Sequence, residues 1–330
     1  MSDKIRISDV AALAGVSTAT VSRALAAPGR VGKETREKVL KAVHATGYQV
    51  NAAARDLRQR RARSILILAP NLSNTFFSRI FAAIQEEASD AGLTVQISDS
   101  RIGREKLATL GHDGRADGII LLDGEIDPEL VNSWRLPVIQ LCEWNPAYHA
   151  PSLAIDNAAA AGLAVRHLAD LGHRNLLHIA GPAGNILAQT RLAGFQDAAQ
   201  AAGVAAAVLP GDFTMESGAG AAHQWAASTN RPTGVFCASD ECALGFISDV
   251  MRLGFDVPGQ VSVVGFDDIE FADRFNPALT TVHQPRATLG RDGARQLIKM
   301  LAGGVTDPVL SQVVPAHLVT RVSTGKAPTV

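Results

Sequence analysis

The sequence predicts an α/β protein whose main part consists of two lobes of doubly wound parallel sheet, preceded by a small all-α headpiece. From Ser64 onward, short continuous apolar runs alternate with amphipathic helical patterns, which is typical of buried parallel strands with helices on both faces. Before residue 50, apolar residues recur only at helical spacing. The number of strand–helix units is too large for one small sheet. We therefore expect two lobes with a ligand cleft at the carboxyl ends of their strands.

The N-terminal residues contain two short helical patterns joined by a tight turn. The first carries Val10, Leu13 and Ala14 on one face, and the second shows the same spacing. Gly15 permits the sharp turn, and Ser17 can cap the second helix, which we expect from about residue 17 to residue 26. Two helices joined in this way form a helix-turn-helix, whose second helix enters the major groove of DNA. An ordinary two-helix corner would show the same apolar pattern.

The charge distribution favours DNA binding over an ordinary helical corner. The whole chain has 31 Lys and Arg against 32 Asp and Glu, but residues 1–63 contain 13 basic and five acidic side chains. A basic module on an acidic body suits binding to phosphate at one end only. The sequence therefore predicts that the N-terminal part binds duplex DNA.

A third helical pattern and a basic segment complete this N-terminal part. Val39, Leu40 and Val43 share one face of the third helix, which we expect to end near Gly47. Residues 50–63 are helix-prone and basic, with Leu57 as their single large apolar group. Such a segment is marginal as an isolated helix. We interpret it as a hinge that folds when docked on DNA; a solvated linker is the alternative.

The remaining chain supplies the predicted elements of the two lobes. Apolar runs predict strands at residues 65–69, 118–122, 138–141, 176–180, 235–238 and 261–265. Amphipathic patterns predict helices at residues 76–91, 158–171, 189–202, 216–227, 243–253 and 288–301.

Several other classes of protein are not expected. No apolar run of about eighteen residues is present and no signal-like segment follows the charged start, so we expect neither a membrane span nor export, and a cytoplasmic location. Cys142, Cys237 and Cys242 show no metal-ligand spacing, which predicts free thiols and no metal site.

An enzyme is not expected either. Neither a Gly-x-Gly-x-x-Gly turn opening a helix nor a phosphate-binding Walker loop is present, and we expect no cofactor. The carboxylates of Asp267 and Asp268 are adjacent in sequence, which usually turns them to different sides. Asp240 and Glu241 lie beside two cysteines but form no defensible pair of nucleophile and base.

Many spaced sequence blocks, in order along the chain, resemble the LacI/GalR family of bacterial repressors. The N-terminal blocks are Asp9–Ala11, Ala14–Ser17, Thr20–Arg23, Thr35–Arg36, Gly47–Tyr48 and Asn51. Later blocks include Asp117–Gly118, Ile155–Asn157, Leu171–Arg174, Arg191–Phe195, Gly211–Phe213, Arg231–Cys237, Val264–Asp267 and Pro277–Thr281. Within the family, this sequence is most similar to the nucleoside-responsive repressors and, less closely, to the purine-responsive repressors.

The resemblance implies a periplasmic-binding-protein-like core, a homodimer, operator DNA as partner, and repression controlled by a small effector, either a sugar or a nucleoside. An exported sugar-binding protein without a DNA role is the alternative. The expected domains are a headpiece at 1–49, a hinge at 50–63 and an effector-binding core at 64–330. Within the core, we expect an N-lobe of about 64–156 plus 286–314 and a C-lobe of about 157–285 plus 315–330.

The candidate DNA contacts divide into two groups. Thr18, Ala19 and Arg23 are candidates for base edges, because small groups can approach the bases and a guanidinium can bind guanine. The candidates for phosphate and supporting contacts are Ser17, Thr20, Ser22, Thr35, Arg36 and Asn51. Leu57 matches the leucine that in relatives wedges into the minor groove; a contact between paired hinges is the alternative.

The resemblance also implies the effector contacts, which are Asn74, Phe76, Phe77, Trp144, Asn185, Arg191, Phe213 and Asp267. Aromatic faces can stack on a sugar or base, while Arg and Asp form directional hydrogen bonds to hydroxyls. Phe77 can instead be a core residue, and Phe213 and Trp144 can line the pocket without contacting the effector. Further polar candidates near the pocket are Glu143, His149 and His178.

Two other positions carry expectations about the pocket's surroundings. Asp156 is expected to form a hydrogen bond at the lobe crossover. The loop expected at 184–190 carries Asn185 and Leu187 where purine-responsive relatives have an arginine and a threonine for their ligand. We therefore do not expect purine recognition in that style.

Overall fold

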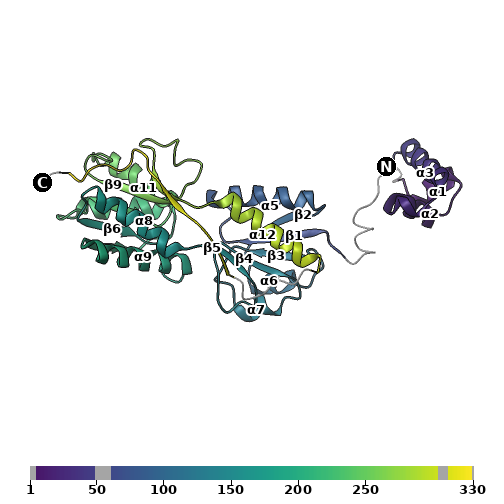
Figure 1. Ribbon diagram of the computed structural model, residues 1–330, viewed down its shortest axis with the longest axis horizontal. Helices are drawn as coiled ribbons and strands as arrows, with labels where there is room; N and C mark the ends of the chain where they lie inside the picture. The colour runs from purple at the N-terminus through teal and green to yellow at the C-terminus, as the bar shows by residue number, and fades with distance from the viewer. Residues whose placement is uncertain (1–4, 49–60, 304–310, 329–330) are drawn as a thin grey trace. The chain divides into compact units, whose positions relative to one another are not determined.

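The computed structural model describes residues 5–48, 61–303 and 311–328 (Figure 1). The chain forms two compact units, residues 1–62 and residues 63–330. The hinge candidates Asn51 and Leu57 lie outside the described residues. No helix within the described ranges is long and apolar enough to cross a membrane.

The first unit is a three-helix cluster. It contains α1 (Ile7–Ala14), α2 (Thr18–Ala26), the short 3₁₀ helix η1 (Pro28–Arg30) and α3 (Lys33–Thr46). Val10, Val21 and Val39 are fully buried at its centre. Gly15 takes a φ of 63° after α1, and the Ser17 hydroxyl accepts a hydrogen bond from the Thr20 N–H at 3.2 Å. The predicted helix-turn-helix is confirmed.

Two apolar side chains that we expected in this core lie outside it. Leu13 is 59% exposed and Leu40 is 45% exposed. Ala11, Ala24 and Ala42 are buried with the three valines instead. The core of so small a unit is built from short side chains, and it leaves little room for leucines at the edge of each helical face.

The second unit contains two six-stranded sheets. The N-lobe sheet has the order β11-β5-β4-β3-β1-β2 and is parallel throughout. Its strands are β1 (Ser64–Ala69), β2 (Thr94–Asp99), β3 (Gly118–Leu121), β4 (Val138–Leu141), β5 (Ser152–Ile155) and β11 (Ser311–Val314). Its helices are η2 (Thr75–Phe77), α5 (Ser78–Asp90), α6 (Arg104–Leu110), α7 (Pro128–Ser133) and α12 (Arg286–Leu301).

The C-lobe sheet has the order β12-β10-β9-β8-β6-β7, with one antiparallel pair between β10 and β12. Its strands are β6 (Asn175–Ile179), β7 (Ala205–Leu209), β8 (Gly234–Cys237), β9 (Ser262–Asp267), β10 (Thr280–His283) and β12 (His317–Val319). Its helices are α8 (Asn157–Asp170), α9 (Ile186–Ala202), α10 (Met215–Ala227) and α11 (Asp240–Arg252).

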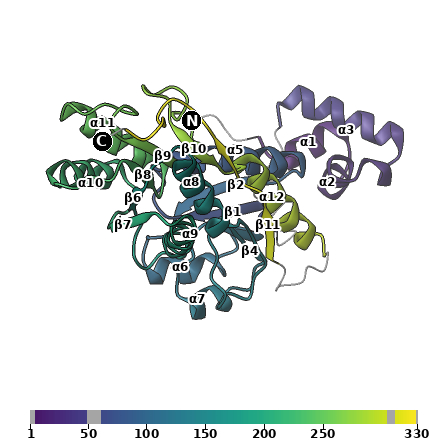
Figure 2. The ribbon, with the colours of Figure 1, turned by 60° about the vertical axis from the view of Figure 1, so that its left-hand side comes forward.

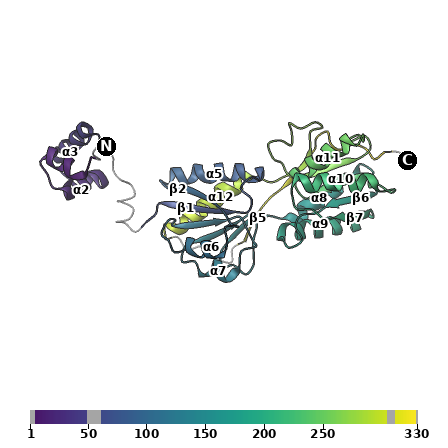
Figure 3. The ribbon, with the colours of Figure 1, turned by 180° about the vertical axis from the view of Figure 1, so that it is seen from behind.

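Both sheets are covered by helices on both faces, which confirms the doubly wound prediction. In the N-lobe, α5 and α12 lie side by side on one face, and α6 and α7 lie on the other (Figures 1 and 3). In the C-lobe, the strands lie between α8 and α9 on one side and α10 and α11 on the other (Figure 2). The chain passes between the lobes after β5, after β10 and after β11.

Some elements differ from the sequence-based expectation. The edge strands β2 and β7 carry mostly exposed or partly exposed side chains, so they lack the continuous apolar run that marks a central strand. Helix α9 begins at Ile186 rather than Gln189, because the Asn185 side chain caps it. The expected loop at 184–190 is therefore mostly helix.

Close packing of α8 on α9 depends on a glycine, and it generates a test. A Cβ at Gly194 would lie 2.1 Å from the Ala158 carbonyl oxygen, whereas a Cβ at Gly220 in α10 would meet nothing within 4 Å. We expect Gly194→Ala to lower the free energy of unfolding by about 1–3 kcal/mol through overpacking.

The matched Gly220→Ala variant should be unchanged or more stable by about 0.5–1 kcal/mol, because alanine favours a helix interior. The measurement is the urea midpoint of each variant by circular dichroism. Equal midpoints for the two variants would contradict the described α8–α9 contact.

Candidate functional site

The exposed face of α2 is the candidate DNA-reading surface. Thr18, Ala19 and Arg23 are exposed on this helix, and Ser22 is partly buried. The Arg23 Nε donates a hydrogen bond to the Ala19 carbonyl at 3.3 Å, within the same helix. Small side chains beside one guanidinium form a surface that can approach base edges closely.

The other DNA candidates in the first unit flank this face. The Ser17 and Thr20 hydroxyls lie 2.9 Å apart at the start of α2, so both take part in the helix cap. Thr35 and Arg36 lie in the first turns of α3, with Arg36 exposed. Their contacts with phosphate stay predictions.

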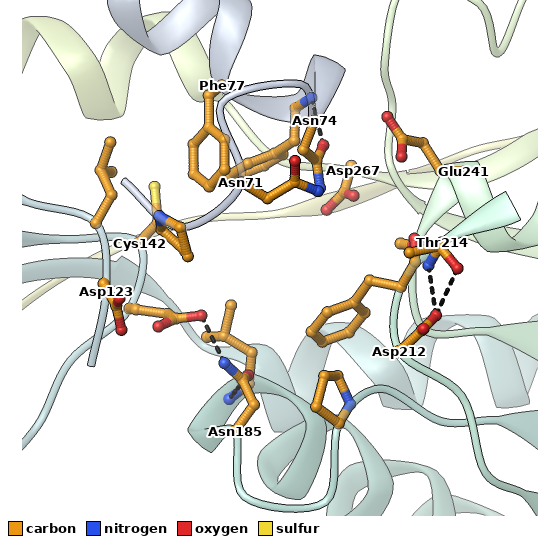
Figure 4. Close-up of a pocket in the computed structure, with 18 of the residues that line it drawn as sticks. Asn71, Asn74, Phe77, Asp123, Cys142, Asn185, Asp212, Thr214, Glu241 and Asp267 are labelled. Carbon is orange, nitrogen blue, oxygen red and sulfur yellow. Dashed lines mark hydrogen bonds between the residues drawn. The ribbon is translucent and has the colours of Figure 1, made fainter. Parts of the chain in front are cut away.

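A cavity of about 300 Å³ lies in the second unit, at the carboxyl ends of the strands of both lobes (Figure 4). N-lobe residues that follow β1, β2, β3 and β4 line one side of it. C-lobe residues that follow β6, β7 and β8, together with the last residue of β9, line the other. This is the position where parallel α/β sheets bind ligands.

Seven of the eight candidate effector residues line this cavity, namely Asn74, Phe76, Phe77, Asn185, Arg191, Phe213 and Asp267. Trp144 is not among the described residues that line it, although Cys142 and Glu143 just before it are. Phe77 is both core and wall: it is only 6% exposed and stacks on Phe81. That these side chains contact an effector stays a prediction.

Arg191 is the most constrained charged group in the cavity wall. Only 3% of it is exposed, and α9 places its guanidinium 3.8 Å over the centre of the Phe266 ring. Its Nε donates to Asn157 Oδ1 at 2.9 Å, and its Nη1 donates to the Ala238 carbonyl at 2.6 Å. These bonds offset much of the cost of burying the charge and fix the guanidinium at the cavity.

Asp267 is the last residue of β9, and it lines the same cavity as Arg191. Gln284 Nε2 donates to its Oδ1 at 2.7 Å, and its backbone has a φ of 121°. Burial raises the pKa of Asp267 to about 6, while the nearby Arg191 and Arg286 charges oppose this rise. The protonation state of this carboxyl therefore changes in a pH range where exposed aspartates are fully ionised.

Hydrogen bonds of Asn185 and Glu241 join the lobes at the cavity. Asn185 of the C-lobe donates through Nδ2 to Glu143 Oε1 of the N-lobe at 2.6 Å. The Thr75 hydroxyl of the N-lobe donates to Glu241 Oε1 of the C-lobe at 2.8 Å. Of these bridging residues, Glu143, Asn185 and Glu241 also line the cavity.

Other expected polar groups have different roles. Asp156 lies in the crossover between β5 and α8 and forms the expected hydrogen bond there: it caps α8, accepting from the Ala159 N–H at 2.9 Å. The reason is local: it directly precedes the helix, where an aspartate satisfies a free N–H. His178 is buried in the core between Phe195 and Phe236, and His149 is exposed away from the cavity.

Four of the cavity carboxylates were not predicted as site residues from the sequence, namely Asp123, Glu125, Asp212 and Glu241. Their common signal is position, since each follows the carboxyl end of a strand within a few residues. In the parts of the chain that are described, no group of three His, Cys, Asp or Glu is placed to hold a metal ion.

Comparisons with known proteins identify the family. The group described as bacterial regulatory proteins, lacI family, matches residues 6–51, and the periplasmic binding protein-like domain matches residues 165–324. The HTH-type transcriptional repressor CytR of Escherichia coli strain K12 is 35% identical over 329 residues, which covers 97% of this chain and 96% of CytR. The chain belongs to the lacI family of bacterial regulatory proteins.

Other proteins of this family are similar over comparable lengths. The repressor PurR of Photobacterium profundum is 33% identical over 305 residues, which covers 89% of this chain and 91% of PurR. A structure of the Lac repressor dimer bound to operator and the anti-inducer ONPF has a TM-score of 0.85 and 29% identity, covering 98% of this chain and 100% of that one.

A complex of the transcriptional regulator CelR with cellobiose has a TM-score of 0.74 and 30% identity, covering 97% of this chain and 99% of that one. This lacI-family chain is a transcriptional regulator with a DNA-binding unit and an effector-binding unit. The predicted resemblance to repressors of this family is confirmed by CytR and PurR.

The raised pKa of Asp267 generates a stability test. Because the folded pKa of about 6 lies above the usual value, ionisation costs folding free energy as the pH rises from about 4 to above 6. Asp267→Asn removes this cost, so above pH 6 the variant should be more stable by about 1–3 kcal/mol, with no difference below pH 4. Asparagine also tolerates the positive φ.

The measurement is the melting temperature of both proteins between pH 4 and pH 8. The control is Asp197→Asn, which changes an exposed aspartate on α9. Parallel profiles for wild type and Asp267→Asn would contradict the raised pKa.

Proposed function

We propose that the chain represses transcription as a homodimer bound to operator DNA, and that a small polyol or nucleoside in the cavity controls this binding. The observation that carries the proposal is the cavity itself, which residues of both lobes line at the carboxyl ends of their strands. The operator-bound Lac repressor dimer and the CelR–cellobiose complex support the two halves of the proposal. Enzymatic activity is not part of it, and operator binding implies a cytoplasmic location.

The proposed division of the chain keeps the boundaries expected from the sequence. Residues 1–49 form the DNA-binding headpiece, 50–63 the hinge and 64–330 the core. The N-lobe comprises about 64–156 plus 286–314, and the C-lobe about 157–285 plus 315–330. The membership of the strands in two separate sheets supports this division of the core.

For DNA, we propose that Thr18, Ala19 and Arg23 contact base edges and that the flanking hydroxyls contact phosphate. The exposed face of α2 supports this assignment, because the second helix of a helix-turn-helix lies in the major groove. Hydrogen bonds to phosphate position such a helix without specifying sequence.

For the effector, we propose that Arg191 and Asp267 bind hydroxyl groups while Phe76, Phe77 and Phe213 contact a sugar or base face. Asp267 Oδ1 is held by Gln284, which orients the second carboxylate oxygen for a ligand. Phe213 has a φ of 70° and lies at the cavity, 5.6 Å from the Arg191 guanidinium. An aromatic wall beside fixed polar groups is typical of polyol and nucleoside sites.

The DNA proposal is tested by selecting binding sites from random duplexes with the full chain and then measuring affinity at fixed salt. We expect Arg23→Ala to weaken binding to the selected duplex by about 1–3 kcal/mol and to relax the preference over scrambled DNA. The control is Arg135→Ala, which removes an exposed arginine from the core and should leave both affinities unchanged.

An equal loss on selected and scrambled duplexes would show that Arg23 contacts phosphate instead of bases. Failure to select any sequence would overturn the repressor proposal and leave a ligand-binding protein without a DNA role.

A further inference from the structure

The cavity contains more acid than its cations balance. Six carboxylates line it, from Asp123, Glu125, Glu143, Asp212, Glu241 and Asp267, against the two guanidinium groups of Arg101 and Arg191. Within the described residues, none of these six forms an ion pair with a Lys, Arg or His side chain. Surface carboxylates such as Glu87 and Glu270, in contrast, each pair with two arginines.

Three of the six gather at the N-lobe end of the cavity, after β3 and β4. Asp123 is 6% exposed and Glu143 is 8% exposed, while Glu125 lies exposed at the rim. The Asn185 amide joins two of them, donating to Glu143 Oε1 at 2.6 Å and to Glu125 Oε1 at 3.4 Å. We call Asp123, Glu125 and Glu143 the acidic end of the cavity.

The hydrogen bonds at the acidic end come from neutral donors. Gly124 N–H donates to Glu143 Oε2 at 2.7 Å, and Glu125 N–H donates to Asp123 Oδ1 at 2.8 Å. The Ser100 hydroxyl donates to Asp123 Oδ2. Burial raises the pKa of Glu143, and the charges of Asp123 and Glu125 raise it further. Burying clustered carboxylates without a cation costs free energy, because their charges are desolvated and repel one another. A bound positive charge would offset that cost.

In the described part of the chain, neither cavity arginine forms an ion pair with the acidic end, although the charge of Arg191 acts on Glu143 from a longer distance. Arg191 is held by Asn157 and Ala238 over the Phe266 ring, and Arg101 is exposed to solvent. A metal ion is not favoured either, because no three acidic, His or Cys groups among the described residues converge as metal ligands. An ammonium nitrogen lies about 2.7–2.9 Å from its acceptors, farther than most metal ions lie from their ligands, so it can bind carboxylates that are spaced more widely than a metal site requires. Glu143 Oε1 and Glu125 Oε1 already lie around one nitrogen, that of the Asn185 amide, at 2.6 and 3.4 Å.

The rest of the cavity suits an organic cation. In the view of Figure 4, Asp123 of the acidic end lies on the left side of the cavity, and Glu241 and Asp212 lie on the right. Phe77 and Phe213 provide aromatic wall within the same cavity. Aromatic faces attract cations in addition to packing against apolar groups. A cavity of about 300 Å³ suits a molecule of the size of a monosaccharide or nucleoside.

We propose that the acidic end of the cavity binds a positively charged amino group, so that the effector is an amine-bearing polyol or nucleoside. This inference rests on the proposed function, since it names the class of effector for the same cavity. The ammonium group binds between Asp123, Glu125 and Glu143, while Arg191 and Asp267 bind hydroxyl groups at the other end.

The test is isothermal titration calorimetry of the full chain at pH 7 and low salt with matched pairs of probes. The pairs are 6-amino-6-deoxy-D-glucose with D-glucose, 6-amino-6-deoxy-D-galactose with D-galactose, and 5′-amino-5′-deoxyadenosine with adenosine. At least one amine should bind about ten-fold or more tightly than its hydroxyl partner, the gain of one charge-assisted hydrogen bond. N-acetylation, which removes the charge, should abolish the gain.

Two variants test which residues cause the preference for the amine over its hydroxyl partner. Glu143→Gln and Glu125→Gln should each reduce the ratio of amine affinity to hydroxyl-partner affinity several-fold. Glu125 is exposed, so its variant should fold even if that of Glu143 does not. The control, Glu216→Gln, changes an exposed carboxylate on α10 and should keep the full preference.

Equal affinity for amine and hydroxyl partners, tighter binding of the neutral partner, or binding of no amine would overturn the proposal. So would a preference that survives both glutamine variants. Operator affinity of the ligand-free samples is measured in parallel. Loss of selective DNA binding there, with the amine preference intact, would overturn the repressor function alone.

Discussion

The buried guanidinium of Arg191 is the interaction on which the cavity depends. It binds the first residue of α8 and the carbonyl that follows β8, and it lies over an aromatic ring of β9. A charge with 3% exposure is tolerated only where such partners are present. One side chain from α9 thereby ties together the strand ends and the helix start that form the C-lobe wall. The negative groups around it, Asp267 foremost, offset its charge.

The two lobes meet at this wall through connections of different strength. Three chain crossovers join them covalently, while Glu143–Asn185 and Thr75–Glu241 join them by hydrogen bonds at the cavity. Arg286 adds a buried bridge from the start of α12 to the Asp268 carbonyl at 2.7 Å. Because Glu143, Asn185 and Glu241 also line the cavity, a ligand there would contact groups that hold the lobes together. Ligand binding and lobe closure are then linked quantities.

A structural route from the core toward the basic segment exists within the second unit. The Arg63 N–H donates to the Asp117 carboxylate at 2.7 Å, so the last basic residue before β1 is anchored on the N-lobe. Strand β1 in turn leads directly to Asn71 and Asn74 in the cavity wall. One strand therefore has the basic segment at its start and the proposed effector site at its end.

Sequence patterns predicted most large helices and the strands β1, β3, β4, β6, β8 and β9, because these buried strands are continuous apolar runs. They missed the short interior strands β5 and β10 and the edge strands β11 and β12. They did not predict β2 and β7, whose edge positions leave side chains exposed, nor the exposure of Leu13 and Leu40 in a small core. The aromatic and charged cavity residues Phe213, Arg191 and Asp267 were found through resemblance to a family.

The acidic end was not found in that way. Glu125 lies 60 residues and Glu143 lies 42 residues before Asn185 in the chain, and they meet its amide only where the two lobes face each other. A local sequence pattern contains no information about a contact between residues so far apart in the chain. The position of each carboxylate just after a strand was a usable signal, but it did not reveal that the charges lack cationic partners.

The central claim is that the cavity and the DNA-binding unit are coupled. The most direct measurement is the dissociation constant of the tightest-binding cavity ligand for the full chain, with and without a saturating selected operator duplex, at one salt concentration. Since coupling between two sites is reciprocal, we predict that the duplex changes ligand affinity by about five-fold or more. Arg191→Met, which removes the guanidinium, should abolish ligand binding in both conditions. Identical affinities with and without the duplex would contradict the account.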